Sequence, residues 1–303
     1  MRQLTSTLFN ELKDGSFTPL LEYVKADDTL DMEFRGNSFT IYYRGGALLA
    51  VKINPDGTCV WDGYNKQYLL KGKNKYEQKH IDVEHFEEYI PEAKHIMDRY
   101  IVLGPKNHLG EKEIQQLVVK ENNYSPNSQD TDYFIVDMEY TDADGDGRFD
   151  LVALRWDSTG TARKKNVVSL ALIEVKQGYN SVRTSASSPG LKSHLKDFNA
   201  FIEKKSSDGG LQEFRDDMAM IFKQKCELGL ISANEKIEGI KQDFPLSVES
   251  NIDFICLLAN YKKASENLRN ELEEIVSCRF IKSHYMGYGL YADEIFTLTS
   301  ESI

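Results

Sequence analysis

Residues 167–176 read "VVSLALIEVK", an apolar run that ends in a glutamate and a lysine. Side chains alternate across a β-strand, so Glu174 and Lys176 are expected to leave the same face of the strand. A buried carboxylate is costly unless it is paired, and either a metal ion or the lysine would supply a partner. The stretch therefore predicts a buried strand with a charged site at its end.

The stretch "RFDLVALRW" at 148–156 adds a second carboxylate, Asp150, near the start of the preceding strand. If the two strands are antiparallel neighbours, the start of the first lies beside the end of the second. We therefore expect Asp150 to meet Glu174 and Lys176. A surface salt-bridge cluster is the alternative interpretation of these three charges.

Two carboxylates and a lysine suit the hydrolysis of a phosphodiester. Mg²⁺ prefers carboxylate and carbonyl oxygen, so Asp150, Glu174 and the Val175 carbonyl are expected to hold one Mg²⁺ or Mn²⁺ ion. Such an ion polarises a phosphate and lowers the pKa of a bound water. Lys176 would orient that water, act as its base, or stabilise charge on the phosphate. The last two roles need opposite protonation states, and the sequence leaves the choice open.

A helix is expected on the amino-terminal side of these strands, in "GEKEIQQLVVKEN" at 110–122. Ile114, Leu117 and Val118 fall on one face of it, and Glu111 lies near that face. Glu111 is therefore expected to reach inward and add a further acid. The other expected elements are strands at 133–140, 252–261 and 278–291, and helices at 190–205, 211–229 and 264–276.

The amino-terminal part of the chain has a different pattern. Residues 1–25 predict a helical start, and residues 80–100 predict a helix with Pro91 near the start of a second segment. Between them, a β-meander is predicted by "LDMEFR", "SFTIYYR" and "ALLAVKI", with turns at "GN", "GG" and "NPDG". We expect an accessory region over 1–102 and a second domain over 103–303.

A glutamate on a helix, then Asp-x(n)-Glu-x-Lys on consecutive strands, then a helix, resembles the pattern of the PD-(D/E)XK nuclease superfamily. The pieces are "GEKEIQQLV", "RFDLVAL" and "LALIEVKQG", within about residues 108–205. The resemblance implies an α/β (α+β) fold with a restriction-endonuclease-like αβββαβ core and a mixed sheet. It also implies divalent-metal dependence and phosphodiester cleavage, with Asp150, Glu174 and Lys176 as catalytic residues and Glu111 as a fourth. Phe149 stands where many members have a proline.

The net charge of −11 argues against a nucleic-acid partner, because phosphate contacts need Lys and Arg. A local basic strip would overcome this. Its candidate members are "ARKK" at 162–165, Arg183, Lys192, Lys196, Lys204 and Lys205. Arg183, Lys192 and His194 are expected to contact the substrate. A surface or helix-capping role is the equal alternative for Arg183 and His194.

A rival motif, "DADGDGRFD" at 142–150, matches the first half of a calcium loop through Asp142, Asp144 and Asp146. Ala153 stands where such a loop needs its bidentate glutamate, so we favour a hairpin turn. Asp137 and Glu139 share a face of the strand expected before it. We expect a structural role for Asp137, and the role of Glu139 stays open.

The leading hypothesis is a divalent-metal-dependent nuclease that acts on DNA in a restriction, repair or defence setting. The alternatives are a catalytically inactive nuclease-fold module that binds nucleic acid or protein, and a calcium-binding interaction protein. The sequence shows neither an apolar run of membrane-spanning length nor a signal-peptide pattern, so we expect a cytoplasmic protein without a membrane partner. A homodimer is an open alternative to a monomer. The four cysteines lack CxxC spacing, and Cys256 is expected to be a small core residue.

Overall fold

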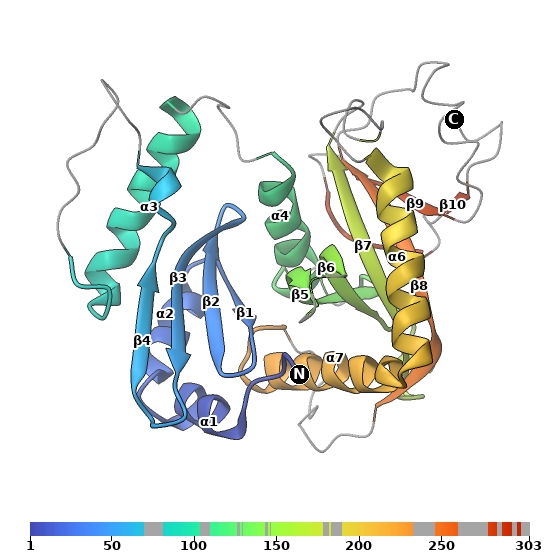
Figure 1. Cartoon of the computed structure of the whole chain (residues 1–303), viewed down its shortest axis with the longest axis horizontal. Coiled ribbons are helices and arrows are strands. Elements are labelled where there is room, and N and C mark those ends of the chain that lie inside the picture. The colour runs from blue at the N-terminus through green and yellow to red at the C-terminus, as the bar shows by residue number, and fades with distance from the viewer. Residues whose placement is uncertain are drawn as a thin grey trace. The chain divides into compact units, whose positions relative to one another are not determined.

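The computed structural model shows a chain that forms two compact units, Met1–Gln116 and Leu117–Ile303 (Figure 1). The residues it describes are 1–69, 81–103, 110–125, 128, 130–142, 145, 147–177, 182, 190–232, 246–259, 278–283, 287–292 and 296–297. The division falls inside the helix α4 (Glu111–Asn123), whereas we expect a domain boundary ahead of that helix, near residue 102. The fold combines helices with one antiparallel and one mixed sheet, so the prediction of an α+β protein is confirmed.

The first unit contains helices and an antiparallel sheet. Its elements are α1 (Ser6–Asp14), α2 (Thr18–Ala26), β1 (Leu30–Phe34), β2 (Ser38–Tyr43), β3 (Gly46–Ile53), β4 (Cys59–Gly63), the 3-10 turn η1 (Lys66–Tyr68) and α3 (Phe86–Leu103). The helical start is divided between α1 and α2, and α3 runs continuously through Pro91. The expected β-meander forms β1, β2 and β3, and β4, which was not predicted, extends the sheet to the order β1-β2-β3-β4. Arg44 and Gly45 join β2 to β3 with φ angles of 49° and 74°, a pair of positive values that suits a tight hairpin.

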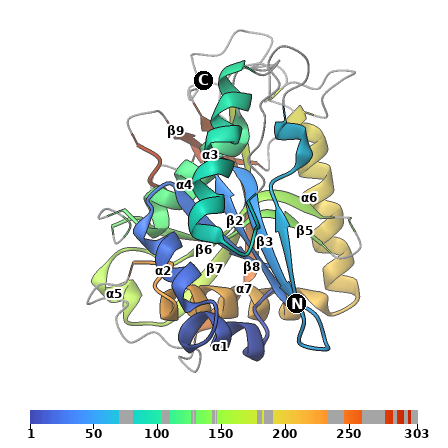
Figure 2. The same ribbon diagram turned by 90° about the vertical axis from the view of Figure 1, so that its left-hand side faces the viewer.

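The second unit is built on a mixed sheet (Figure 2). Its strands are β5 (Tyr133–Thr141), β6 (Arg148–Arg155), β7 (Val167–Gln177), β8 (Ser247–Ala259), β9 (Arg279–Ser283) and β10 (Phe296–Thr297). Among the described residues their order across the sheet is β10-β9-β8-β7-β6-β5. The β5–β6 and β6–β7 pairs are antiparallel, whereas β7–β8 and β8–β9 are parallel. The mixed sheet and the antiparallel pairing of β6 with β7 agree with the predictions.

Helices pack on this sheet and connect its strands. They are α5 (Gly160–Arg163), α6 (Gly190–Ser207) and α7 (Gly210–Glu227), with the carboxyl-terminal part of α4. The contacts of α7 are with β5, β6 and β8, and those of α6 are with β8 and α7. The helix expected at 264–276 lies outside the described residues. None of the helices that the structure describes is long and apolar enough to cross a membrane.

The buried face of α4 differs from the expected one. Leu117 is 40% exposed, whereas Val118 and Val119 are fully buried, so its place in the apolar stripe was wrong. Buried amide side chains extend the buried face of α4 beyond the apolar residues. Asn123 is buried and exchanges two hydrogen bonds with the backbone of Ile135, at 2.8 and 2.9 Å, which ties the end of α4 to β5. Cys256 lies in the core of the sheet on β8, as predicted.

Candidate functional site

Asp150 lies where β6 and β7 separate. The register between these strands begins at the pair Leu151–Ile173, one residue after Asp150 and one before Glu174. Beyond that pair, Asp150 Oδ2 accepts a hydrogen bond from the Val175 N–H at 2.7 Å. A side chain thus takes a backbone donor of β7, and this contact holds the Asp150 carboxylate over the end of β7.

Glu174 and Lys176 form a buried pair on β7. Lys176 Nζ lies 2.6 Å from Glu174 Oε1, and the two side chains are 7% and 4% exposed. Their separation by two residues places them on one face of the strand, which is what allows the contact. Removing one partner of such a pair leaves a buried charge without compensation, so each member of the pair stabilises the other.

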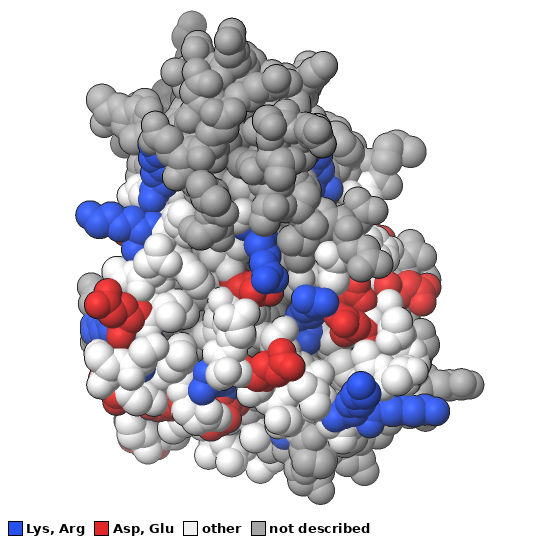
Figure 3. Space-filling model, turned by 90° about the vertical axis from the view of Figure 1, so that its right-hand side faces the viewer, with Lys and Arg blue, Asp and Glu red and all other residues white. Residues whose placement is uncertain are grey.

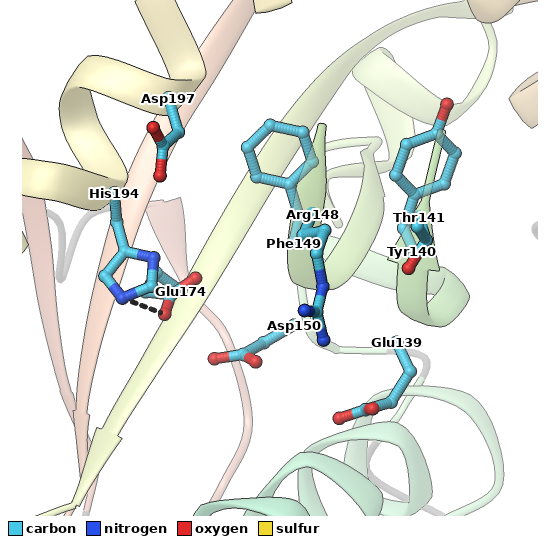
Figure 4. Close-up of a pocket in the computed structure, with 9 residues that line it drawn as sticks. All are labelled: Glu139, Tyr140, Thr141, Arg148, Phe149, Asp150, Glu174, His194 and Asp197. Carbon is cyan, nitrogen blue, oxygen red and sulfur yellow. Dashed lines mark ion pairs between the residues drawn. The ribbon is translucent and has the colours of Figure 1, made fainter. Parts of the chain in front are cut away.

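His194, on α6, completes the surroundings of Glu174. Its Nε2 lies 3.2 Å from Glu174 Oε1, the same oxygen that Lys176 contacts (Figure 4). Burial and the nearby Lys176 charge lower the pKa of His194 to about 4. The imidazole is therefore neutral at neutral pH, so its contact with Glu174 joins a neutral ring to a carboxylate and is not an ion pair between two charges. His194 thus contacts a predicted catalytic carboxylate, while its expected contact with substrate stays a prediction.

A pocket of about 360 Å³ opens beside these carboxylates. Its described lining residues are Glu139, Tyr140, Thr141, Arg148, Phe149, Asp150, Glu174, His194 and Asp197. Figure 4 shows the carboxylates of Asp150 and Glu174, from neighbouring strands, facing this common space. Lys176 is not among the described lining residues, and its Nζ contacts Glu174 Oε1.

Glu139 reaches the pocket through an irregularity in β5. The β5–β6 register shifts between Ile135 and Asp137, and Glu139 has a φ of 57°, a left-handed value that a glutamate rarely adopts. The Asn123 side chain uses the Ile135 backbone groups at the same place. Strand alternation does not predict this irregularity; Glu139 lines the pocket, whereas Asp137 is buried.

Two charged lining residues, Arg148 and Asp197, were not predicted from the sequence. Arg148 precedes Asp150 by two residues on β6, so the alternation that groups Glu174 with Lys176 could have found it. Asp197 follows His194 by three residues on α6, which places both on one side of the helix. Their types alone carry no signal, because charged residues are frequent on any exposed strand end or helix.

Three other predicted site residues, Glu111, Val175 and Lys192, lie among the described residues. Glu111 begins α4 and belongs to the first unit, so its role beside the carboxylates of the second unit stays a prediction. Val175 is buried, and its N–H serves Asp150, whereas its carbonyl as a metal ligand stays a prediction. Lys192 is half-buried near the start of α6. Arg183 lies outside the described residues.

The expected basic strip is wrong at one member. Arg163 is 4% exposed, because its guanidinium packs over the rings of Phe134 and Trp156, at 4.7 and 5.1 Å from their centroids. Lys205 is paired with Asp142 at 3.1 Å. On the face drawn in Figure 3, the described Lys and Arg side chains are interspersed with Asp and Glu rather than joined in one stripe.

The rival calcium motif connects β5 to β6 in an antiparallel hairpin. Asp142 N–H donates to the Gly147 carbonyl at 2.8 Å, and Gly145 N–H donates to the Asp142 carbonyl at 2.9 Å. The Asp142 carboxylate accepts from Tyr140 Oη at 3.2 Å and pairs with Lys205. These contacts agree with the preferred hairpin turn; Asp144 and Asp146 lie outside the described residues.

The donor set at the pocket suits Mg²⁺ in one respect. This ion is commonly held by one or two carboxylates with several waters, and Asp150 and Glu174 supply two. A carboxylate offers about four lone-pair sites, so the hydrogen bonds from Val175 N–H to Asp150 and from Lys176 to Glu174 leave acceptor capacity. The described residues contain no group of three or more His, Cys, Asp or Glu side chains arranged to hold a metal ion. Any ion here would therefore rest on two protein carboxylates, with waters and substrate oxygens completing its shell.

Comparison of the chain with protein-family models, with curated proteins and with solved structures finds no match.

Proposed function

We propose that this protein is a divalent-metal-dependent nuclease that hydrolyses phosphodiester bonds in DNA. One observation carries the proposal: Asp150 and Glu174, from the separating ends of two antiparallel strands, line one pocket. The order α4, β5, β6, β7, α6, β8 supports the further proposal that the second unit has a restriction-endonuclease-like αβββαβ core.

Asp150 and Glu174 would hold Mg²⁺ or Mn²⁺, which supplies Lewis acidity toward the phosphate and lowers the pKa of a bound water. The chain itself supplies rigid carboxylates. Val175 N–H orients Asp150, while Lys176 and His194 both contact Glu174 Oε1. Side chains held by such supporting contacts keep the geometry of a site without reorganisation during the reaction.

The geometry favours a role for Lys176 that differs from the three expected ones. Its Nζ lies 2.6 Å from Glu174 Oε1, and it is not among the described residues that line the pocket, so we assign it as a positioning residue for that carboxylate. A base or a direct phosphate ligand would have to face the pocket. We therefore assign the substrate-facing chemistry to the carboxylates and to the lining residues.

Cleavage of DNA tests the proposal. Plasmid, linear duplex and single-stranded DNA would be incubated with purified protein in Mg²⁺, in Mn²⁺ and in EDTA. We expect cleavage with either metal and none in EDTA. Asp150→Asn and Glu174→Gln should each lower the rate about a hundredfold or more, because each removes a metal ligand while keeping side-chain shape.

Glu213→Gln is the matched control, because it neutralises an exposed carboxylate on α7 that does not line the pocket. It should cleave like the wild type. Wild-type protein that binds DNA but cuts none of the substrates with either metal would replace the nuclease by a binding module. Cleavage that persists in both carboxylate variants would place the reaction elsewhere.

A further inference from the structure

The shared pocket has a basic residue in its wall. Arg148 is the one Lys or Arg among the described residues that line it. The lining also includes four carboxylates, those of Glu139, Asp150, Glu174 and Asp197. A polyanionic substrate entering this pocket would meet Arg148 as the cation that faces it, since Lys176 is buried against Glu174.

Arg148 is placed to reach a substrate. It is the first residue of β6, its side chain is exposed, and it stands two residues before Asp150 on the same side of the strand. Figure 4 shows its guanidinium pointing into the pocket, toward the side where Asp150 and Glu139 lie. It forms no ion pair with the residues that the structure describes, in contrast to Lys176.

The guanidinium group matches this task chemically. It is always charged, is more weakly hydrated than an ammonium, and presents a planar fork of donors that fits two phosphate oxygens at once. We propose that Arg148 binds a backbone phosphate of the DNA beside the scissile bond, an inference that rests on the proposed function. Arg148 then binds the substrate phosphate, and Lys176 positions the Glu174 carboxylate.

Binding and kinetics together test Arg148. The affinity for a fluorescent DNA duplex would be measured by anisotropy in EDTA, where the proposed hydrolysis does not proceed, at several salt concentrations. We expect Arg148→Ala to weaken binding about tenfold and to reduce the slope of log affinity against log salt by roughly one. Arg148→Lys should keep the slope but recover only part of the affinity, because it keeps the charge and loses the fork. In Mg²⁺, Arg148→Ala should raise KM more than it lowers kcat.

The matched control is Lys52→Ala, which removes one exposed positive charge on β3 of the first unit, outside the candidate basic strip. It should change affinity less than about twofold and leave the salt slope unchanged. Arg148→Ala behaving like this control would overturn the inference, even if the wild type cleaves DNA. Thermal unfolding of each variant identifies loss of fold, and an unchanged salt slope with a lower Tm would give Arg148 a structural role and overturn the inference.

The two proposals fail in different ways. A wild type that cuts DNA while Arg148→Ala binds and cuts normally removes the inference and keeps the nuclease. A wild type that cuts nothing, but binds DNA with a salt slope that depends on Arg148, removes the nuclease and keeps the inference. A wild type that does not bind DNA at all removes both.

Discussion

His194 carries a pH dependence that follows from its burial. Its pKa of about 4 lies below the ordinary value of 6.5, so between these values the unfolded chain binds a proton that the folded chain does not. Stability then falls as the pH falls, by at most about 1.4 kcal/mol per pH unit. The contribution of a neutral His194 is complete above pH 6.5 and is lost as the pH approaches 4.

We expect His194→Gln to flatten this dependence, because an amide does not titrate. The variant should be less stable than the wild type at pH 7, by about 1 kcal/mol from lost packing, and the difference should shrink or reverse near pH 5. Urea unfolding in EDTA at pH 7, 6 and 5 measures it. His95→Gln, at an exposed histidine of α3, is the control. Parallel curves for wild type and His194→Gln would contradict the assignment.

The connection between β6 and β7 is held by a buried cation. Arg163, at the end of α5, donates from Nε to the Asp157 carbonyl at 3.0 Å and from Nη2 to the Thr131 carbonyl at 2.9 Å. Burial lowers its pKa to about 10, which still leaves it charged at neutral pH. Its guanidinium also packs over two aromatic rings. These contacts hold the connection between β6 and β7 against Thr131 and the two rings.

We expect Arg163→Lys to destabilise the protein by about 2–4 kcal/mol, because a lysine cannot make both carbonyl contacts and the planar stacking at once. Urea unfolding monitored by circular dichroism measures the loss. Lys165→Ala, two residues further along and exposed, should stay within about 0.5 kcal/mol of the wild type. Equal stability of Arg163→Lys and the wild type would show that the guanidinium does not anchor the loop.

Arg163 and Glu139 show which features of the structure a local sequence pattern does not predict. Period-two alternation predicts β5, β6 and β7 and the contact between Glu174 and Lys176, because these depend on neighbours in the chain. The burial of Arg163 depends on rings from two other segments, so "ARKK" reads as an exposed basic run. The register of β5 shifts beside Ile135, where Asn123 of a preceding helix bonds to the backbone, and Glu139 has a left-handed backbone. Both are tertiary effects that a local pattern does not contain.

At the scale of the whole molecule, the net charge of −11 destabilises the compact state through repulsion between negative charges. The carboxylates that line the pocket contribute to this repulsion. Two carboxylates that face one pocket repel each other unless a cation lies between them. An ion that binds the folded state and not the unfolded chain stabilises the protein by RT ln(1 + [L]/Kd). Stability measured with and without metal therefore reports on the site independently of any cleavage.

We expect 10 mM Mg²⁺ to stabilise the wild type by about 1.4 kcal/mol if its Kd is on the order of 1 mM, which raises Tm by roughly 2–4 °C. Thermal unfolding in EDTA and in Mg²⁺, with NaCl added to equal ionic strength, measures the shift. Asp150→Asn combined with Glu174→Gln should remove it, whereas Glu213→Gln should keep it. The double variant should also lose less stability than the wild type when Mg²⁺ is withdrawn, because its pocket no longer holds two repelling charges. A Tm rise of equal size in the double variant would mean that Mg²⁺ acts on the general surface charge. Asp150 and Glu174 would then not be the residues that bind the ion.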